Sequence, residues 1–245
     1  MTTYDAGDDR TRLPVSATLA WWATAWLRGH VVTDLLLDAL AGDDRLHRLA
    51  DGATLPVVLG GWRAAGATEV GLALPVEGDP LGLGGPPSLN TLALELGEAV
   101  VCSRAGAALV PEVSTETVTW HELPAERRQL PDVGEADRDL RGQLIAAADG
   151  LAALDVARWR PEAADLFLDR RRPAPAAPPG VPARCVDLAG RALTAVAIAD
   201  LALDDDGGAV SASEAQARQA VLLPLERAAR RALVAACSPE VWPPA

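Results

Sequence analysis

The chain has 245 residues, of which 49% are hydrophobic and 23% charged, and this composition suits a globular protein with a buried core rather than a disordered one. A formal net charge of −12 opposes contact with phosphate backbones, so no nucleic-acid partner is expected. All 22 basic residues are arginines, and without lysine the chain forms neither a Schiff base nor a Walker-type loop, which excludes covalent pyridoxal-phosphate chemistry.

The three cysteines, Cys102, Cys185 and Cys237, lie far apart in the chain and form no Cys-x-x-Cys pair. Zinc sites and redox motifs need closely spaced ligands, so we expect neither a metal nor a cofactor and interpret the cysteines as small buried residues of a cytosolic protein. Residues 1–12 are polar and acidic, which predicts a flexible tail rather than a signal peptide. No apolar run reaches the ~20 residues of a membrane helix, so no membrane contact is expected.

Helices are predicted before residue 50. The spacing of Trp22 and Trp26 indicates a helix that Ser16 can cap. A second helical face continues through residues 31–40, and a short helix is expected at 43–50.

Three tryptophans gather in the first helix. Trp21 and Trp22 point about 100° apart, so Trp21, Trp22 and Trp26 together exceed what one helix face buries. Either the surplus packs on both the sheet and the C-terminal helices, or it reaches a second subunit, since tryptophan is enriched at interfaces. These three residues are the candidate interface of a homo-oligomer.

The middle of the chain predicts a small, mainly antiparallel sheet over about residues 55–122. The apolar runs Leu55–Leu59 and Val70–Leu74 are interpreted as an antiparallel strand pair, because the connection between them is short for a parallel crossover. In a later strand, Val118 and Trp120 alternate with polar residues and should face the core. The further strands are expected at 99–102, 107–110 and 117–122, with a short helix at 88–96.

The loop 78–90 is the most unusual stretch, because it holds four glycines, three prolines and the only asparagine of the chain. Its glycine amides, with the dipole of the following helix, suit an anion or a small ligand. Alternatively, the loop is a rigid corner or a partner-contact loop. Its glycine spacing does not match the dinucleotide-binding fingerprint. The candidate ligand-binding residues are Gly82, Gly84, Gly85, Ser88 and Asn90.

Other possible catalytic groups have little support. His121 lies on the polar face of a predicted strand, and the adjacent Glu122 must point to the opposite face, so the two form no direct dyad. The acidic run Asp204–Asp206 lacks the spacing of a calcium loop, and no Gly-x-Ser-x-Gly elbow is present. The catalytic residues therefore stay unknown, and whether the chain is an enzyme stays open.

From residue 124 the pattern becomes helical. Helices are predicted around Leu140–Leu154, from Pro161 to Arg172, over Cys185–Leu203, and from Ser211 to Ala236 with a kink at Pro224. The composition of the proline-rich stretch 173–182 predicts a semi-rigid spacer. The alternative is a segment that a proline-recognising domain binds.

These elements predict an α+β fold in which helices from both ends of the chain pack a small sheet and the C-terminal half is all-helical. We expect a flexible tail (1–12), an α+β part (13–123), a helical part (124–237) and an extended tail (238–245), with the packing into one domain left open.

Three segments, Ala73–Pro86, Arg128–Asp137 and Arg227–Cys237, resemble an uncharacterised family of actinobacterial proteins, and the likeness covers most of the chain. The resemblance implies a source but no activity, ligand or site. The function expected is that of a non-catalytic cytosolic protein acting through protein contacts, as a homo-oligomer. The alternative is a small-molecule- or anion-binding protein or enzyme that uses the loop 78–90.

Overall fold

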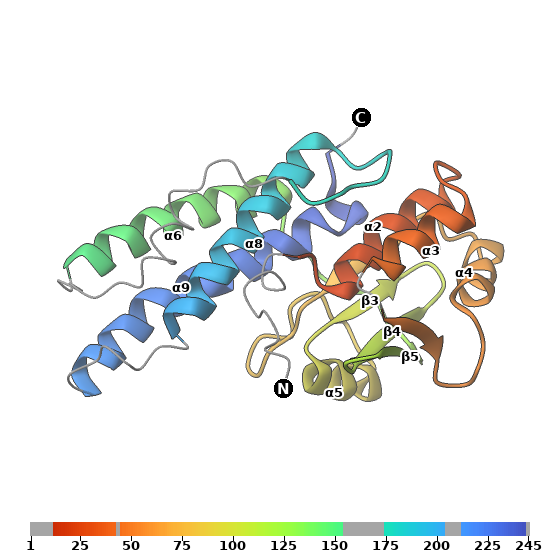
Figure 1. Ribbon diagram of the computed structural model, residues 1–245, viewed down its shortest axis with the longest axis horizontal. Coiled ribbons are helices and arrows are strands. Elements are labelled where there is room, and N and C mark those ends of the chain that lie inside the picture. The colour runs from red at the N-terminus through yellow and green to blue at the C-terminus, as the bar shows by residue number, and fades with distance from the viewer. Residues whose placement is uncertain (1–11, 43–44, 154–173, 204–211, 244–245) are drawn as a thin grey trace.

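The computed structural model describes residues 12–42, 45–153, 174–203 and 212–243. It consists of a five-stranded sheet covered by helices on both faces and a helical arm that projects to one side (Figure 1). The α+β fold with a helical C-terminal half is therefore confirmed. Within the described residues, no helix is both long and apolar enough to cross a membrane.

The strands are β1 (Leu46–Leu49), β2 (Gly71–Ala73), β3 (Ala99–Cys102), β4 (Ala107–Val113) and β5 (Thr117–Pro124), in the spatial order β1-β5-β4-β3-β2. The pairs formed by β2, β3, β4 and β5 are antiparallel, and β1 runs parallel to β5. The prediction of a mainly antiparallel sheet is confirmed, as is the inward orientation of Val118 and Trp120, which are fully buried.

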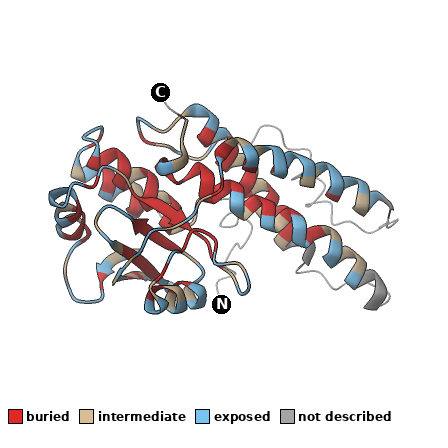
Figure 2. Cartoon of the chain, turned by 180° about the vertical axis from the view of Figure 1, so that it is seen from behind, coloured by how far each residue is buried: buried red, intermediate tan, exposed pale blue. Residues whose placement is uncertain are grey.

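Three helices, α2 (Val15–Leu27), α3 (Thr33–Ala41) and α4 (Leu55–Ala64), cover one face of the sheet, and their side chains form a core cluster with Leu109 and Trp120. The other face is covered by α5 (Pro87–Leu96), which packs Leu89 and Ala93 against β3 and β4. Figure 2 shows the buried residues running between these layers.

The arm contains α6 (Val133–Ala153), α8 (Ala183–Leu203) and α9 (Ala212–Ala236), and α9 lies against both of the others. One core cluster joins the arm to the N-terminal half, since Trp21 and Leu72 pack with residues of all three helices. After α9 a single 3-10 turn, Pro239–Val241, returns to the edge of the sheet. An extended tail was expected there, and at these three residues that prediction is wrong.

The expected strand Leu55–Leu59 is wrong, because these residues begin α4. Pro56 occupies the first helical turn, where a missing N–H is tolerated. The buried residues of α4, which include Leu55, Leu59 and Trp62, recur at helical spacing. A short apolar run does not by itself distinguish a strand from a helix. The apolar positions continue at helical spacing to Trp62, and this longer pattern indicates the helix.

The expected short helix 43–50 is also wrong, because Leu46–Leu49 form β1. Hydrogen bonds from the amides of Leu46 and Ala50 to the carbonyl oxygens of Glu116 and Trp120 hold this segment on β5. Tertiary pairing thus overrides local helical preference in a segment too short to nucleate a helix.

The first helix forms as expected, but Ser16 does not cap it with its side chain. Pro14 is the N-cap, and the Ser16 amide donates to a carboxylate oxygen of Glu98 at 2.8 Å. A distant side chain therefore satisfies a free amide of the first turn.

The proline-rich stretch packs onto the fold. Pro178 is buried, Gly180 lies against the ring of His30, and Pro175 lies against Gly190 of α8. The helix expected at Pro161–Arg172, the acidic run 204–206 and Ser211 lie outside the described residues.

Candidate functional site

The loop 78–90 lies where β2, the linker 125–132 and the C-terminal end of the chain meet. The amide of Leu74 binds the carbonyl oxygen of Leu81 at 3.1 Å, so the chain folds back on itself after β2. Leu81 and Leu83 are buried, which holds the loop against the core. Polar groups from four separate parts of the sequence converge around it.

The loop glycines approach the protein's own chain closely. A Cβ at Gly84 would overlap the carbonyl oxygen of Arg127, and a Cβ at Gly82 would lie 2.8 Å from the carbonyl oxygen of Leu72. Gly85 has a φ of +110° and faces the carboxylate of Glu126. Gly82 and Gly84 fit only glycine because the protein's own main chain passes beside them, and Gly85 favours glycine because its φ is positive.

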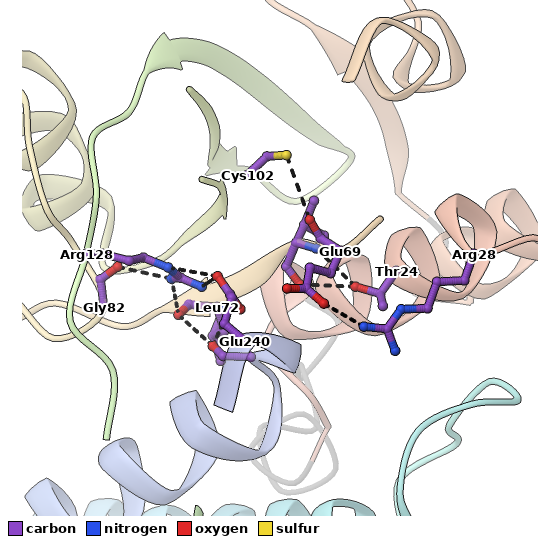
Figure 3. Close-up of polar contacts among 10 residues, drawn as sticks. Thr24, Arg28, Glu69, Leu72, Gly82, Cys102, Arg128 and Glu240 are labelled. Atoms are coloured by element: carbon purple, nitrogen blue, oxygen red, sulfur yellow. Dashed lines mark hydrogen bonds and ion pairs between the residues drawn. The ribbon is translucent and has the colours of Figure 1, made fainter. Parts of the chain in front are cut away.

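Arg128 is the central group of this junction (Figure 3). Its side chain is 2% exposed and donates to the carbonyl oxygens of Leu72 and Gly82 at 2.9 and 3.1 Å. The same guanidinium forms an ion pair with Glu240 at 2.8 Å. A buried cation needs such partners, and here they tie β2, the loop and the C-terminal segment together.

Arg230 of α9 binds the loop from another direction. It donates to the carbonyl oxygen of Leu74 at 3.1 Å and pairs with Asp79 at 3.4 Å. Its second ion pair, with Glu226 of the same helix, measures 3.7 Å. Two arginines thus anchor the main chain around the loop at three carbonyl oxygens, those of Leu72 and Leu74 before it and that of Gly82 within it.

The C-terminal segment covers the free edge of β2. The amide of Leu72 donates to the carbonyl oxygen of Cys237 and to Oγ of Ser238, at 3.3 and 3.2 Å. A Cβ at Gly71 would collide with Arg128, Glu240 and Ser238, so only glycine fits this position in the strand.

A second polar group lies beside the first and joins α2 to the strand side (Figure 3). The Thr24 hydroxyl and the main chain of Val70 exchange hydrogen bonds of 3.1 Å. Arg28 pairs with Glu69 at 2.6 Å and lies over the ring of Trp242. These contacts position the start of β2 on the first helix.

Two family models match the chain. One describes the N-terminal domain of Rv1486c-like proteins and covers residues 16–136, and the other describes the C-terminal domain of the same proteins and covers residues 134–234.

The chain belongs to the Rv1486c-like family. The resemblance to an uncharacterised family is thereby confirmed, and the two domain models meet where α6 begins. No curated protein and no solved structure matches this Rv1486c-like chain.

The cysteines of this Rv1486c-like protein are free and buried. Burial raises the pKa of Cys102, raises that of Cys185 to about 11 and raises that of Cys237 well above its usual value. Near neutral pH these thiols are therefore protonated, a form that is a poor nucleophile. In the described part of the chain, no group of three His, Cys, Asp or Glu residues could hold a metal ion.

The other predicted ligand-binding residues lie at the start of α5. Ser88 is exposed, and Asn90 is partly buried. Oδ1 of Asn90 is buried and makes no hydrogen bond within the described ranges. The ligand-binding role of the loop stays a prediction.

The three tryptophans of α2 are all used in internal packing. Trp21 is fully buried in the cluster shared with the arm, Trp22 packs against two core clusters, and Trp26 is almost buried beneath the guanidinium of Arg63, 3.7 Å from its ring. Their role in an interface stays a prediction.

His121 pairs with Glu112 of β4 at 3.0 Å, and Glu122 accepts a hydrogen bond from the indole of Trp62 on the other face of the sheet. The expectation that His121 and Glu122 point apart is thus confirmed.

Sequence reasoning missed Arg128, Arg230 and Glu240. The two arginines lie 46 to 156 positions from their partners around the loop, and Arg128 and Glu240 lie 112 positions apart. Such separations leave no periodic signal in the sequence. The spacing of Glu226 and Arg230 marks one helix face but not the loop that Arg230 reaches.

Proposed function

We propose that this chain is a non-catalytic cytosolic protein that acts through protein–protein contacts, including contacts with copies of itself. The observation that carries this proposal is a concentration of exposed large apolar side chains between residues 32 and 57. Of nine such side chains in the described residues, five fall in this stretch. They are Val32, Leu35, Leu37, Leu46 and Val57.

Single exposed apolar residues are common on monomeric proteins, whereas several on neighbouring elements are typical of an interaction surface. The five side chains belong to α3 and the residue before it, to β1 and to α4, and β1 lies against both helices. The polar groups around the loop 78–90 also favour a non-catalytic role. Arg128 and Arg230 are bound by carbonyl oxygens and carboxylates of the chain itself, so these contacts stabilise the fold. The free thiols suit a reducing compartment.

Light scattering after gel filtration tests the proposal over a hundredfold range of protein concentration. The expected result is a mass of about twice the 25.5 kDa of one chain at micromolar concentration. A mass of one chain over the whole range would contradict the self-association.

A second candidate function is the binding of a small anion or polar molecule at the loop 78–90. It is favoured by the buried Oδ1 of Asn90, which has no hydrogen-bond donor within the described ranges. A thermal-shift screen of phosphates, nucleotides and carboxylic acids tests it, because a ligand at a hundred times its dissociation constant stabilises the fold by about 2.7 kcal/mol.

In that screen Asn90→Ala should weaken the response to a hit, and Thr91→Ala, on the exposed side of α5, should leave it unchanged. Substitution of Gly84 is unsuitable, since any Cβ there collides with Arg127 whether or not a ligand binds. A screen without any hit would contradict this second function.

A further inference from the structure

The outward face of α4 is apolar along its whole length, which is unusual for a helix at the surface. Val57 is 66% exposed, and Gly61 and Ala64 are exposed beside it. The opposite face, with Leu59 and Trp62, is buried in the core. The one charged side chain of α4 is the exposed Arg63, which lies over the ring of Trp26, and the rest of the helix is apolar. Such a helix normally lies inside a protein, yet α4 lies at the end of the molecule farthest from the arm (Figure 1).

The fold gives no internal reason for the two glycines in this face. A Cβ at Gly60 or Gly61 would meet nothing within 4 Å, and neither residue has a positive φ. Glycine weakens a helix interior relative to alanine, and alanine would fit both positions in the isolated chain. Glycines at a helix surface allow another backbone to approach closely.

The arrangement of the face identifies the partner. Val57 and Ala64 lie symmetrically on either side of the pair Gly60 and Gly61. When two copies of α4 cross antiparallel about a two-fold axis, Val57 meets Ala64 of the partner subunit and Gly60 meets Gly61 of the partner subunit. This is the self-complementary pattern that an isologous contact requires.

The charges around α4 favour the same arrangement. Residues 55–68 contain no acidic side chain, although the chain as a whole carries a net charge of −12. Copies that meet through this helix therefore bring no carboxylates of residues 55–68 together, which limits their repulsion. Asp51 precedes the helix, whereas Arg63 and Arg104 lie at its C-terminal end, so an antiparallel pair brings opposite charges together at both rims.

We propose that α4 is the dimerisation helix of this protein and that it packs antiparallel on α4 of a second copy through Val57, Gly60, Gly61 and Ala64. This inference rests on the proposed self-association and adds the surface, the partner and the register. The dimer buries the one face of α4 that the single chain leaves exposed.

Light scattering of the full chain and three variants tests this surface. Gly60→Glu and Val57→Asp place charge and bulk in the contact, and each should raise the dimer dissociation constant at least tenfold. Gly60→Glu should keep the far-UV circular dichroism of the native chain, because glutamate favours a helix more than glycine does. The matched control is Ile145→Glu on α6, where a side chain of similar exposure (65%) is replaced and the dimer should persist.

A cross-linking pair tests the register independently of those variants. The three native thiols are buried, so cysteines placed on α4 are the ones that react. Val57→Cys combined with Ala64→Cys should give a covalent dimer on mild oxidation, and Val57→Cys alone should give far less, because it faces an alanine.

A native dimer that withstands both Gly60→Glu and Val57→Asp, or that gives no covalent dimer with the double cysteine variant, would overturn the assignment to α4. The proposed function would survive that result, since self-association would then use another surface. A native chain that stays monomeric would overturn both.

Discussion

The indole groups of Trp21 and Trp242 donate to the same acceptor, the carbonyl oxygen of Ala236, at 3.1 and 2.9 Å. The first helix and the C-terminal segment therefore meet at the last residue of α9. A carbonyl oxygen has two lone pairs, so both bonds form at once. This shared acceptor links two regions more than 200 residues apart.

Replacing either tryptophan should leave the oxygen with one donor. Trp242→Phe should lower the free energy of unfolding by about 0.5–1.5 kcal/mol, the net contribution of one hydrogen bond. Trp21→Phe and Trp242→Phe together should exceed the sum of the single effects by about 0.5 kcal/mol or more, because neither indole remains. Urea denaturation of the four proteins measures this, and strictly additive losses would contradict the sharing.

Removal of the Arg128 side chain should destabilise the fold more than any single tryptophan substitution above. Arg128→Met leaves the carboxylate of Glu240 and two carbonyl oxygens without their donor, and the expected loss is about 3–5 kcal/mol. Arg128→Met with Glu240→Leu should recover part of it by removing the unpaired charge. Chemical denaturation measures the free energy of unfolding of both variants. A loss below about 1 kcal/mol for Arg128→Met would show that the contacts of Arg128 contribute little to stability.

The buried thiols should make the protein sensitive to alkaline pH. Burial raises the pKa of Cys185 from 9.0 to about 11, so the folded chain holds this proton more tightly than the unfolded chain. The resulting stability is complete below pH 9 and is lost as the pH rises towards 11. Cys185→Ala should flatten the fall of unfolding free energy over this window, and an unchanged slope would contradict the prediction.

Glu98 should destabilise the fold at neutral pH. Burial raises the pKa of Glu98, although the hydrogen bond from the Ser16 amide opposes the shift. The folded state therefore favours the protonated acid, and this contribution is present below pH 4.5 and lost as the pH rises through the folded pKa.

Glutamine keeps the acceptor for the Ser16 amide without the charge. Glu98→Gln should therefore raise the free energy of unfolding at pH 7, and the increase should be smaller at pH 4. Glu95→Gln, on the exposed face of α5, is the control, and denaturation at the two pH values is the measurement. A gain that does not change with pH would show that the effect is not the charge of Glu98.

The elements with a long or regular pattern could be predicted from the sequence. The helices α6, α8 and α9 repeat apolar residues over five or more turns, and β5 alternates cleanly around Val118 and Trp120. Such patterns are dictated by which face is buried. The errors at β1 and α4 concern segments of four and ten residues, where the neighbour in space decides the conformation.

The candidate site was located by its glycines and prolines, but its chemistry could not be predicted. Gly84 is required because Arg127 passes beside it, and Gly71 because Arg128 and Glu240 lie over it. These neighbours come from other parts of the chain. A glycine-rich loop alone does not say whether a ligand or the protein itself occupies the adjacent space.

The cover that the C-terminal segment forms over β2 bears on how this protein can be divided. The N-terminal family model ends at residue 136, before Ala236, Ser238 and Glu240, which supply the hydrogen bonds for Trp21, Leu72 and Arg128. A fragment that stops there would carry an unpaired strand edge and a buried arginine without its counter-ion. We therefore expect the N-terminal half to be stable only when the C-terminal segment is present, although the two halves match separate family models.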